Sequence, residues 1–185
     1  DASELWGGDS GFGSYRASVY SKGPYAFHIL RMTFGNDKFF KFLKMLAQDL
    51  KGREIVTRDI QAEAEKAFGG NMEWFFDQWI RGVGLPEFNF TYTVRPTEDG
   101  KYLVEGQVEQ KILVGRKKDV LEGTYFRGRV PITIKWKDGN EQFYDLIVEA
   151  QSKTTFKFKL PQAPASLVFN KYDEMLAHDV IATKS

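Results

Sequence analysis

The sequence predicts an α+β chain with two parts: an N-terminal α-helical bundle over residues 1–86 and an antiparallel β-sandwich of immunoglobulin-like type over residues 87–185. Three observations favour this division. Apolar residues before Pro86 recur at helical spacing, apolar residues after it alternate with a period of two, and glycine, asparagine and aspartate punctuate both halves. A length of 185 residues fits one large domain or two small ones.

Four amphipathic helices are expected before Pro86, after an irregular glycine-rich lead-in over residues 1–14. Each helix has an apolar stripe, and capping residues such as Gly35, Asn36 and Thr57 mark the ends. In chain order, the predicted stripes are Phe27, Leu30 and Phe34; Phe39, Leu43, Leu46 and Leu50; Ile60, Ala64 and Phe68; and Phe75, Phe76, Trp79 and Ile80.

Short strands separated by turns are expected after Pro86. Asp138-Gly139 is typical of a hairpin turn between two of them. About seven short strands with turns between them favour an immunoglobulin-like sandwich, and the absence of a cysteine pair argues against a true antibody-type domain. The clearest alternating segments are residues 88–92, 102–108, 130–136, 143–148, 156–160 and 167–169.

Composition and charge exclude several classes of protein. The formal net charge is +1, from 26 basic and 25 acidic residues, which gives no electrostatic case for binding nucleic acid or an anionic membrane. No apolar run approaches the roughly 18–20 residues of a membrane-spanning helix. The absence of cysteine excludes disulfides, thiolate metal sites and a cysteine nucleophile. Because the chain begins at Asp1 and not at a methionine, we expect further polypeptide upstream, and the compartment stays open.

The ionisable residues do not form a recognisable catalytic or metal site by themselves. The two histidines, His28 and His178, stand at opposite ends of the chain, and neither belongs to an H-E-x-x-H pair. No G-x-S-x-G nucleophile elbow is present. The acidic pairs Asp59/Glu63 and Glu63/Glu65 are typical of a solvated helix face. We therefore expect no metal ion in this chain.

Tyr20 is the residue with the clearest chemical potential. In Tyr20-Ser21-Lys22-Gly23 a phenol hydroxyl precedes a helical pattern, where it can donate a hydrogen bond to an oxyanion. From residue types alone, ordinary packing of the Tyr20 ring is the alternative interpretation, because the other groups of a catalytic site are missing from the chain.

Four motifs follow one another between residues 15 and 86. They are Tyr20-Ser21-Lys22-Gly23; Gly35-Asn36-Asp37-Lys38-Phe39; Thr57-Arg58-Asp59-Ile60; and Phe75-Phe76-Asp77-Gln78-Trp79 with Gly84-Leu85-Pro86. In this order and spacing they resemble the gluzincin zinc aminopeptidases, the family of alanyl aminopeptidase and leukotriene hydrolase. The β part is similar to the sandwich that follows the catalytic domain in that family.

The resemblance implies that residues 1–86 are the distal part of a thermolysin-like catalytic domain. In that family a zinc-bound water attacks the peptide carbonyl, and a tyrosine hydroxyl helps to stabilise the oxyanion. The matching tyrosine is Tyr20, and Tyr15 occupies a position where some members carry a second active-site tyrosine. The H-E-x-x-H helix, the distant glutamate ligand and the G-x-M-E-N strand are absent.

The resemblance therefore implies a C-terminal fragment of a zinc aminopeptidase that removes N-terminal residues from peptides. Zinc would belong to the parent enzyme, and this chain alone is expected to hold no cofactor and to be inactive. Its expected partners are the upstream part of the same polypeptide and, through the parent active site, a peptide substrate. Two alternatives stay open: a non-catalytic member that binds peptides on the same scaffold, and a binding module that uses the loops of the sandwich.

Overall fold

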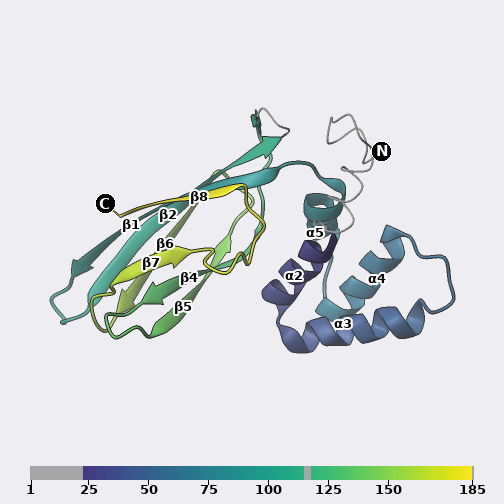
Figure 1. The fold of residues 1–185 in the computed structure, drawn as a ribbon, viewed down its shortest axis with the longest axis horizontal. Coiled ribbons are helices and arrows are strands. Elements are labelled where there is room, and N and C mark those ends of the chain that lie inside the picture. Colours follow the sequence, from purple (N-terminus) through teal and green to yellow (C-terminus); the bar gives the residue numbers. More distant parts are fainter. Residues whose placement is uncertain (1–22, 115–117, 185) are drawn as a thin grey trace. The chain divides into compact units, whose positions relative to one another are not determined.

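The computed structural model describes residues 23–114 and 118–184. The chain divides into two compact units, Asp1–Val83 and Gly84–Ser185, drawn in Figure 1 as a helical part and a sheet part. The sequence pattern places this boundary at residue 86. The assignment of the helical unit to a catalytic domain remains a prediction.

The helices of the helical unit begin and end close to the residues that the sequence indicates. Gly35 has a φ of 84°, and its N–H donates to the carbonyl of Arg31 at 2.9 Å, which makes it the predicted C-terminal cap. Thr57 is the first residue of its helix, but Asp59 supplies the cap, because its carboxylate accepts the N–H of Val56 at 3.0 Å. The elements are α2 (Gly23–Phe34), α3 (Asn36–Asp49), α4 (Thr57–Phe68), α5 (Glu73–Phe76) and the π-helical turn η3 (Asp77–Arg81).

Aromatic rings fill the core of the helical unit, and two predicted stripes need correction. Phe42, which the predicted stripe of α3 omits, is fully buried, and its ring lies 6.0 Å from that of Phe27 and 5.2 Å from that of Phe68. Phe27 and Phe34 of the predicted α2 stripe are only partly buried, although their rings stack on those of Phe42 and Phe68. The buried residues of α2 are Ala26, Ile29 and Leu30.

The fourth predicted helix is an α-helical turn that continues into η3. Phe75, Phe76 and Trp79 are buried, which confirms them as core residues. Ile80, predicted on the same stripe, is exposed, because a π-helical turn is wider than an α-helical one and moves the following side chain off the 3.6-residue stripe. In the described residues, no helix is long and apolar enough to cross a membrane.

The β unit contains the predicted strands and two further ones. The unpredicted strands β3 and β8 are short and almost wholly exposed, so their sequences carry no clear alternation. Asp138-Gly139 makes the predicted hairpin turn, with Gly139 at a φ of 88°. The strands are β1 (Leu85–Pro96), β2 (Tyr102–Val114), β3 (Asp119–Leu121), β4 (Gly128–Lys135), β5 (Glu141–Val148), β6 (Lys153–Leu160), β7 (Ser166–Phe169) and β8 (Asp179–Lys184).

The strands form two sheets, which Figure 1 shows one over the other within the β unit. The larger sheet has the order β3-β2-β1-β8, with β6 also paired to β2, and the smaller sheet has the order β5-β4-β7. β1 and β8 run parallel, so the prediction of a purely antiparallel arrangement is wrong for this pair. The more specific immunoglobulin-like type remains a prediction.

The core of the β unit lies between the two sheets. The ring of Phe169 on β7 lies 5.3 Å from that of Phe88 and 5.4 Å from that of Phe90, both on β1. The Phe90 ring also stacks on Phe156 of β6 at 5.6 Å. A side chain at Gly106 would collide with the Phe156 ring, so the cross-strand glycine makes room for the aromatic stack.

Candidate functional site

The two predicted catalytic tyrosines, Tyr20 and Tyr15, lie outside the described residues. The described chain begins at Gly23, the first residue of α2, so the helix that follows the Tyr20 motif in the sequence is present. Pro24 occupies the first turn of α2, where its missing N–H removes no helical hydrogen bond. The catalytic roles of both tyrosines therefore remain predictions.

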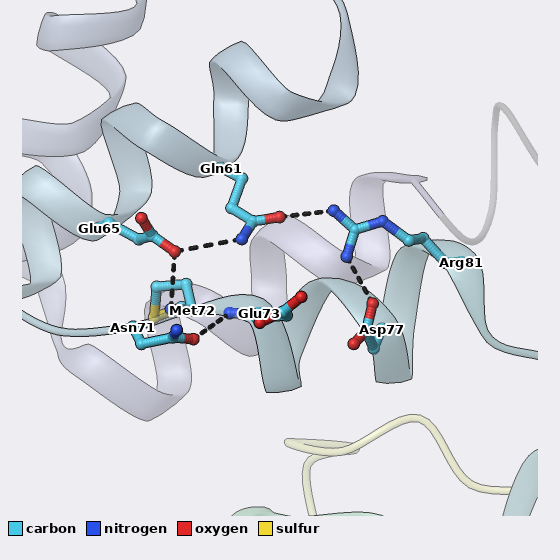
Figure 2. Close-up of polar contacts among 7 residues, drawn as sticks. All are labelled: Gln61, Glu65, Asn71, Met72, Glu73, Asp77 and Arg81. Atoms are coloured by element: carbon cyan, nitrogen blue, oxygen red, sulfur yellow. Dashed lines mark hydrogen bonds and ion pairs between the residues drawn. The ribbon is translucent and has the colours of Figure 1, made fainter.

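The helical unit contains a polar network that joins α4 to α5 and η3 (Figure 2). Gln61 is its centre: its Nε2 donates to Glu65 at 3.1 Å, and its Oε1 accepts from Arg81 at 2.5 Å. Glu65 also accepts the backbone N–H of Met72 at 3.1 Å, and Arg81 pairs with Asp77 at 2.5 Å. The network thus fixes the segment that carries the Phe-Phe-x-Gln-Trp motif against α4.

Glu65 is held as a carboxylate by this network. The hydrogen bonds from Gln61 and from the Met72 N–H lower its pKa, because both donors favour the charged form. Sequence reasoning assigned Glu65 to a solvated face, and that interpretation missed its structural contacts. The position of Glu65 four residues before Gly69-Gly70 could have indicated these contacts, because a long side chain there can reach the start of the next helix.

Glu63 is a second departure from the predicted solvated face. It is 4% exposed; one carboxylate oxygen pairs with Lys66 at 2.5 Å, and the other is buried without a hydrogen-bond partner among the described residues. The burial of Glu63 could have been predicted from the helical spacing, since Glu63 lies three residues after Ile60 and four before Ala67 on the buried side of α4.

The described residues do not fit a zinc site. His28 lies in the helical unit with its ring edge-on to Tyr25 at 5.4 Å, whereas His178 is an exposed residue of the β unit whose N–H donates to Pro86 at 2.7 Å. Across residues 23–114 and 118–184, no three His, Asp or Glu side chains gather as a possible metal site. The zinc implied by the resemblance has no ligand set in the described part of the chain.

Comparison with known proteins relates the chain to aminopeptidases. No family model matches the sequence. A stretch of 70 residues, 38% of the chain, is 33% identical to aminopeptidase N of Lactococcus lactis subsp. lactis and covers 8% of that protein.

Among solved structures, the fold is similar to that of Legionella pneumophila aminopeptidase A, determined in complex with aspartic acid. The TM-score is 0.68 over 92% of this chain and 18% of that one, with 17% sequence identity. Likeness at this identity shows the fold alone. The chain spans less than a fifth of either relative, and it is similar in part of its sequence to one aminopeptidase and in its fold to part of another.

Proposed function

We propose that this chain is the distal part of a zinc-dependent aminopeptidase of the gluzincin type. The observation that carries the proposal is the 70-residue similarity to an aminopeptidase N. The fold likeness over 92% of the chain supports it, since this likeness extends through both units. On this proposal the helical unit completes a catalytic domain, and the zinc ligands belong to polypeptide outside these 185 residues.

In the proposed enzyme, Tyr20 acts on the substrate carbonyl. When water adds to a peptide carbonyl, the oxygen acquires negative charge, and a phenol hydroxyl placed at hydrogen-bond distance stabilises that charge. A tyrosine suits this role because its O–H is a strong neutral donor with a pKa of about 10 in free solution. Tyr15 is proposed as a second, lesser contributor.

The remaining described residues have structural roles in this proposal. The network around Gln61 holds the last helical segment of the unit in place, and the β unit serves as a packed structural module. The chain alone is proposed to be inactive. The alternative, a non-catalytic peptide-binding or protein-binding module on the same scaffold, becomes the better description if the longer protein lacks zinc and peptidase activity.

The test is a conservative substitution in the protein expressed from the complete open reading frame. Tyr20→Phe removes one hydroxyl and should lower kcat about 100- to 1,000-fold, the usual loss for one oxyanion donor, while the zinc content stays the same. Tyr15→Phe should have a smaller effect. The matched control is Tyr102→Phe, which removes a hydroxyl from a half-buried residue of β2 in the other unit.

Steady-state kinetics on an aminoacyl substrate and metal analysis of each variant give the answer. Unchanged turnover of Tyr20→Phe would contradict the role of Tyr20. A wild-type protein with neither zinc nor peptidase activity would overturn the enzyme proposal and favour the non-catalytic module.

A further inference from the structure

The outer face of the smaller sheet exposes large apolar side chains. The strand register places Phe143 of β5 beside Thr133 of β4, and Thr133 beside Val168 of β7, so the three side chains form one row across the sheet. Phe143 is 52% exposed, whereas Thr133, in the middle of the row, is fully buried although it points away from the core. Because Thr133 is buried between its two neighbours in the row, we infer that the three side chains form one continuous surface.

Tyr172, just after β7, adds a second exposed ring to this row. Tyr172 is 53% exposed, and its ring lies 6.4 Å from that of Phe143. The Tyr172 hydroxyl donates to Glu141 at 2.9 Å and accepts from Lys171 at 2.7 Å, and the Lys171 ammonium lies 4.4 Å from the ring centre. The charged pair Lys171–Glu141 thus holds an exposed aromatic ring in one orientation. We call Phe143, Tyr172, Val168 and Thr133 the aromatic patch.

The outer face of the larger sheet has the opposite character. Acidic and basic residues pair across its strands, which is typical of a surface that stays in water. The pairs are Glu87–Lys111 at 2.7 Å, Glu105–Lys157 at 2.6 Å and Glu109–Lys153 at 3.6 Å. Ile181 of β8, an apolar side chain, is also exposed on this face, whereas the exposed aromatic rings among the described residues of the β unit, Phe143 and Tyr172, belong to the aromatic patch.

Most of the charges near the aromatic patch are paired with one another. Lys171 pairs with Glu141, and Arg129 pairs with Asp145 at 2.6 Å on the same outer face. Lys135 of β4 stands opposite Glu141 on the same face and adds one positive charge, so the net charge of the face is small and gives little attraction to a nucleic acid, an anionic lipid or a strongly charged protein. Its chemistry fits an apolar polypeptide surface, and a ring that is ordered before binding costs little entropy when it docks.

We propose that the aromatic patch is an intramolecular docking surface for another part of the same, longer polypeptide. The inference rests on the proposed function, in which this chain is a fragment. The relatives contain much polypeptide beyond the matched part, since the chain covers 18% of one and 8% of the other. A segment of the same chain is present at high effective concentration, so it can cover an apolar surface of small net charge without the strong contacts that a separate partner would need.

Hydroxyl-radical footprinting tests the proposal on the protein expressed from the complete open reading frame. The rate of oxidation of each residue is divided by its rate in the denatured protein, and the measurement is repeated over a dilution series. We expect loss of oxidation at Phe143 and Tyr172 at every concentration. The matched reference is Phe40 of α3, which is 55% exposed and lies in the other unit.

Each alternative occupant gives a different result. Protection that disappears on dilution would show a second copy of the chain on the patch, and oxidation of Phe143 as fast as that of Phe40 would show an open surface; either result overturns the proposal. A peptidase assay on the same sample separates the two proposals. An active enzyme with an open patch contradicts the docking alone, whereas an inactive protein with a protected patch contradicts the proposed activity and leaves the docking supported.

Discussion

Gln110 in the β unit and Glu63 in the helical unit are long polar side chains that the fold buries in different ways. The Gln110 amide donates to the carbonyls of Phe126, Glu149 and Gln151 at 2.9–3.0 Å and accepts the N–H of Phe126 at 2.9 Å. Glu63 has one oxygen on Lys66 and one without a partner. The comparison teaches that burial of a polar group stabilises a fold only where its hydrogen-bonding capacity is used.

Removing the amide of Gln110 should have the largest effect on stability. Gln110→Leu removes the hydrogen bonds that the Gln110 amide makes to the N–H of Phe126 and to three backbone carbonyls, so we expect a loss of about 2–4 kcal/mol in the free energy of unfolding. Urea denaturation of the chain measures it. The control Gln107→Leu, on the same strand with a single contact to Glu109, should change stability by less than about 0.5 kcal/mol. Equal effects of the two variants would refute the role given to Gln110.

The same comparison predicts the opposite sign for Glu63. Glu63→Leu replaces a poorly paired buried carboxylate on the Ile60 and Ala67 side of α4 with an apolar side chain, and should stabilise the helical unit by about 1–2 kcal/mol. Glu65→Leu is the matched control and should destabilise the unit by about 1–2 kcal/mol, because the Met72 N–H loses its acceptor. Thermal unfolding of both variants gives the comparison, and destabilisation by Glu63→Leu would mean that its free oxygen has a partner in solution.

Asp99 is an exposed carboxylate in the turn after β1. Compared with the buried Gln110 and Glu63, it should have the smallest effect on the free energy of unfolding. The hydrogen bond from the Thr97 hydroxyl, followed by the one from Lys159, lowers the pKa of Asp99 from 3.8 to about 2. Because the folded-state pKa is the lower one, the stabilisation is present above pH 3.8 and is lost as the pH falls from 3.8 through about 2. In a side-chain NMR titration, Thr97→Val should move the Asp99 midpoint up towards 3.8, and an unmoved midpoint would exclude Thr97 as the main cause.

The candidate site could be predicted from the sequence only through residues that resemble a family. Tyr20 and Tyr15 rest on that resemblance and remain predictions. The network around Gln61 could not be predicted, because it joins Gln61 to Arg81 across a helix break, and neither residue has a distinctive local pattern. The zinc ligands expected of the parent enzyme could not be predicted, because the motifs that supply them are absent from this sequence.

The sequence by itself determined the helices of the first unit, six of the strands of the second, the Gly35 cap and the Asp138-Gly139 turn. These features follow from apolar periodicity and from backbone preferences that act over a few residues. Only the tertiary structure decided the parallel pairing of β8 with β1, the fully hydrogen-bonded burial of Gln110, the incompletely hydrogen-bonded burial of Glu63 and the exposure of Phe143. The physical reason is that long-range pairing and burial depend on which distant segments meet, and local periodicity carries no information about that choice.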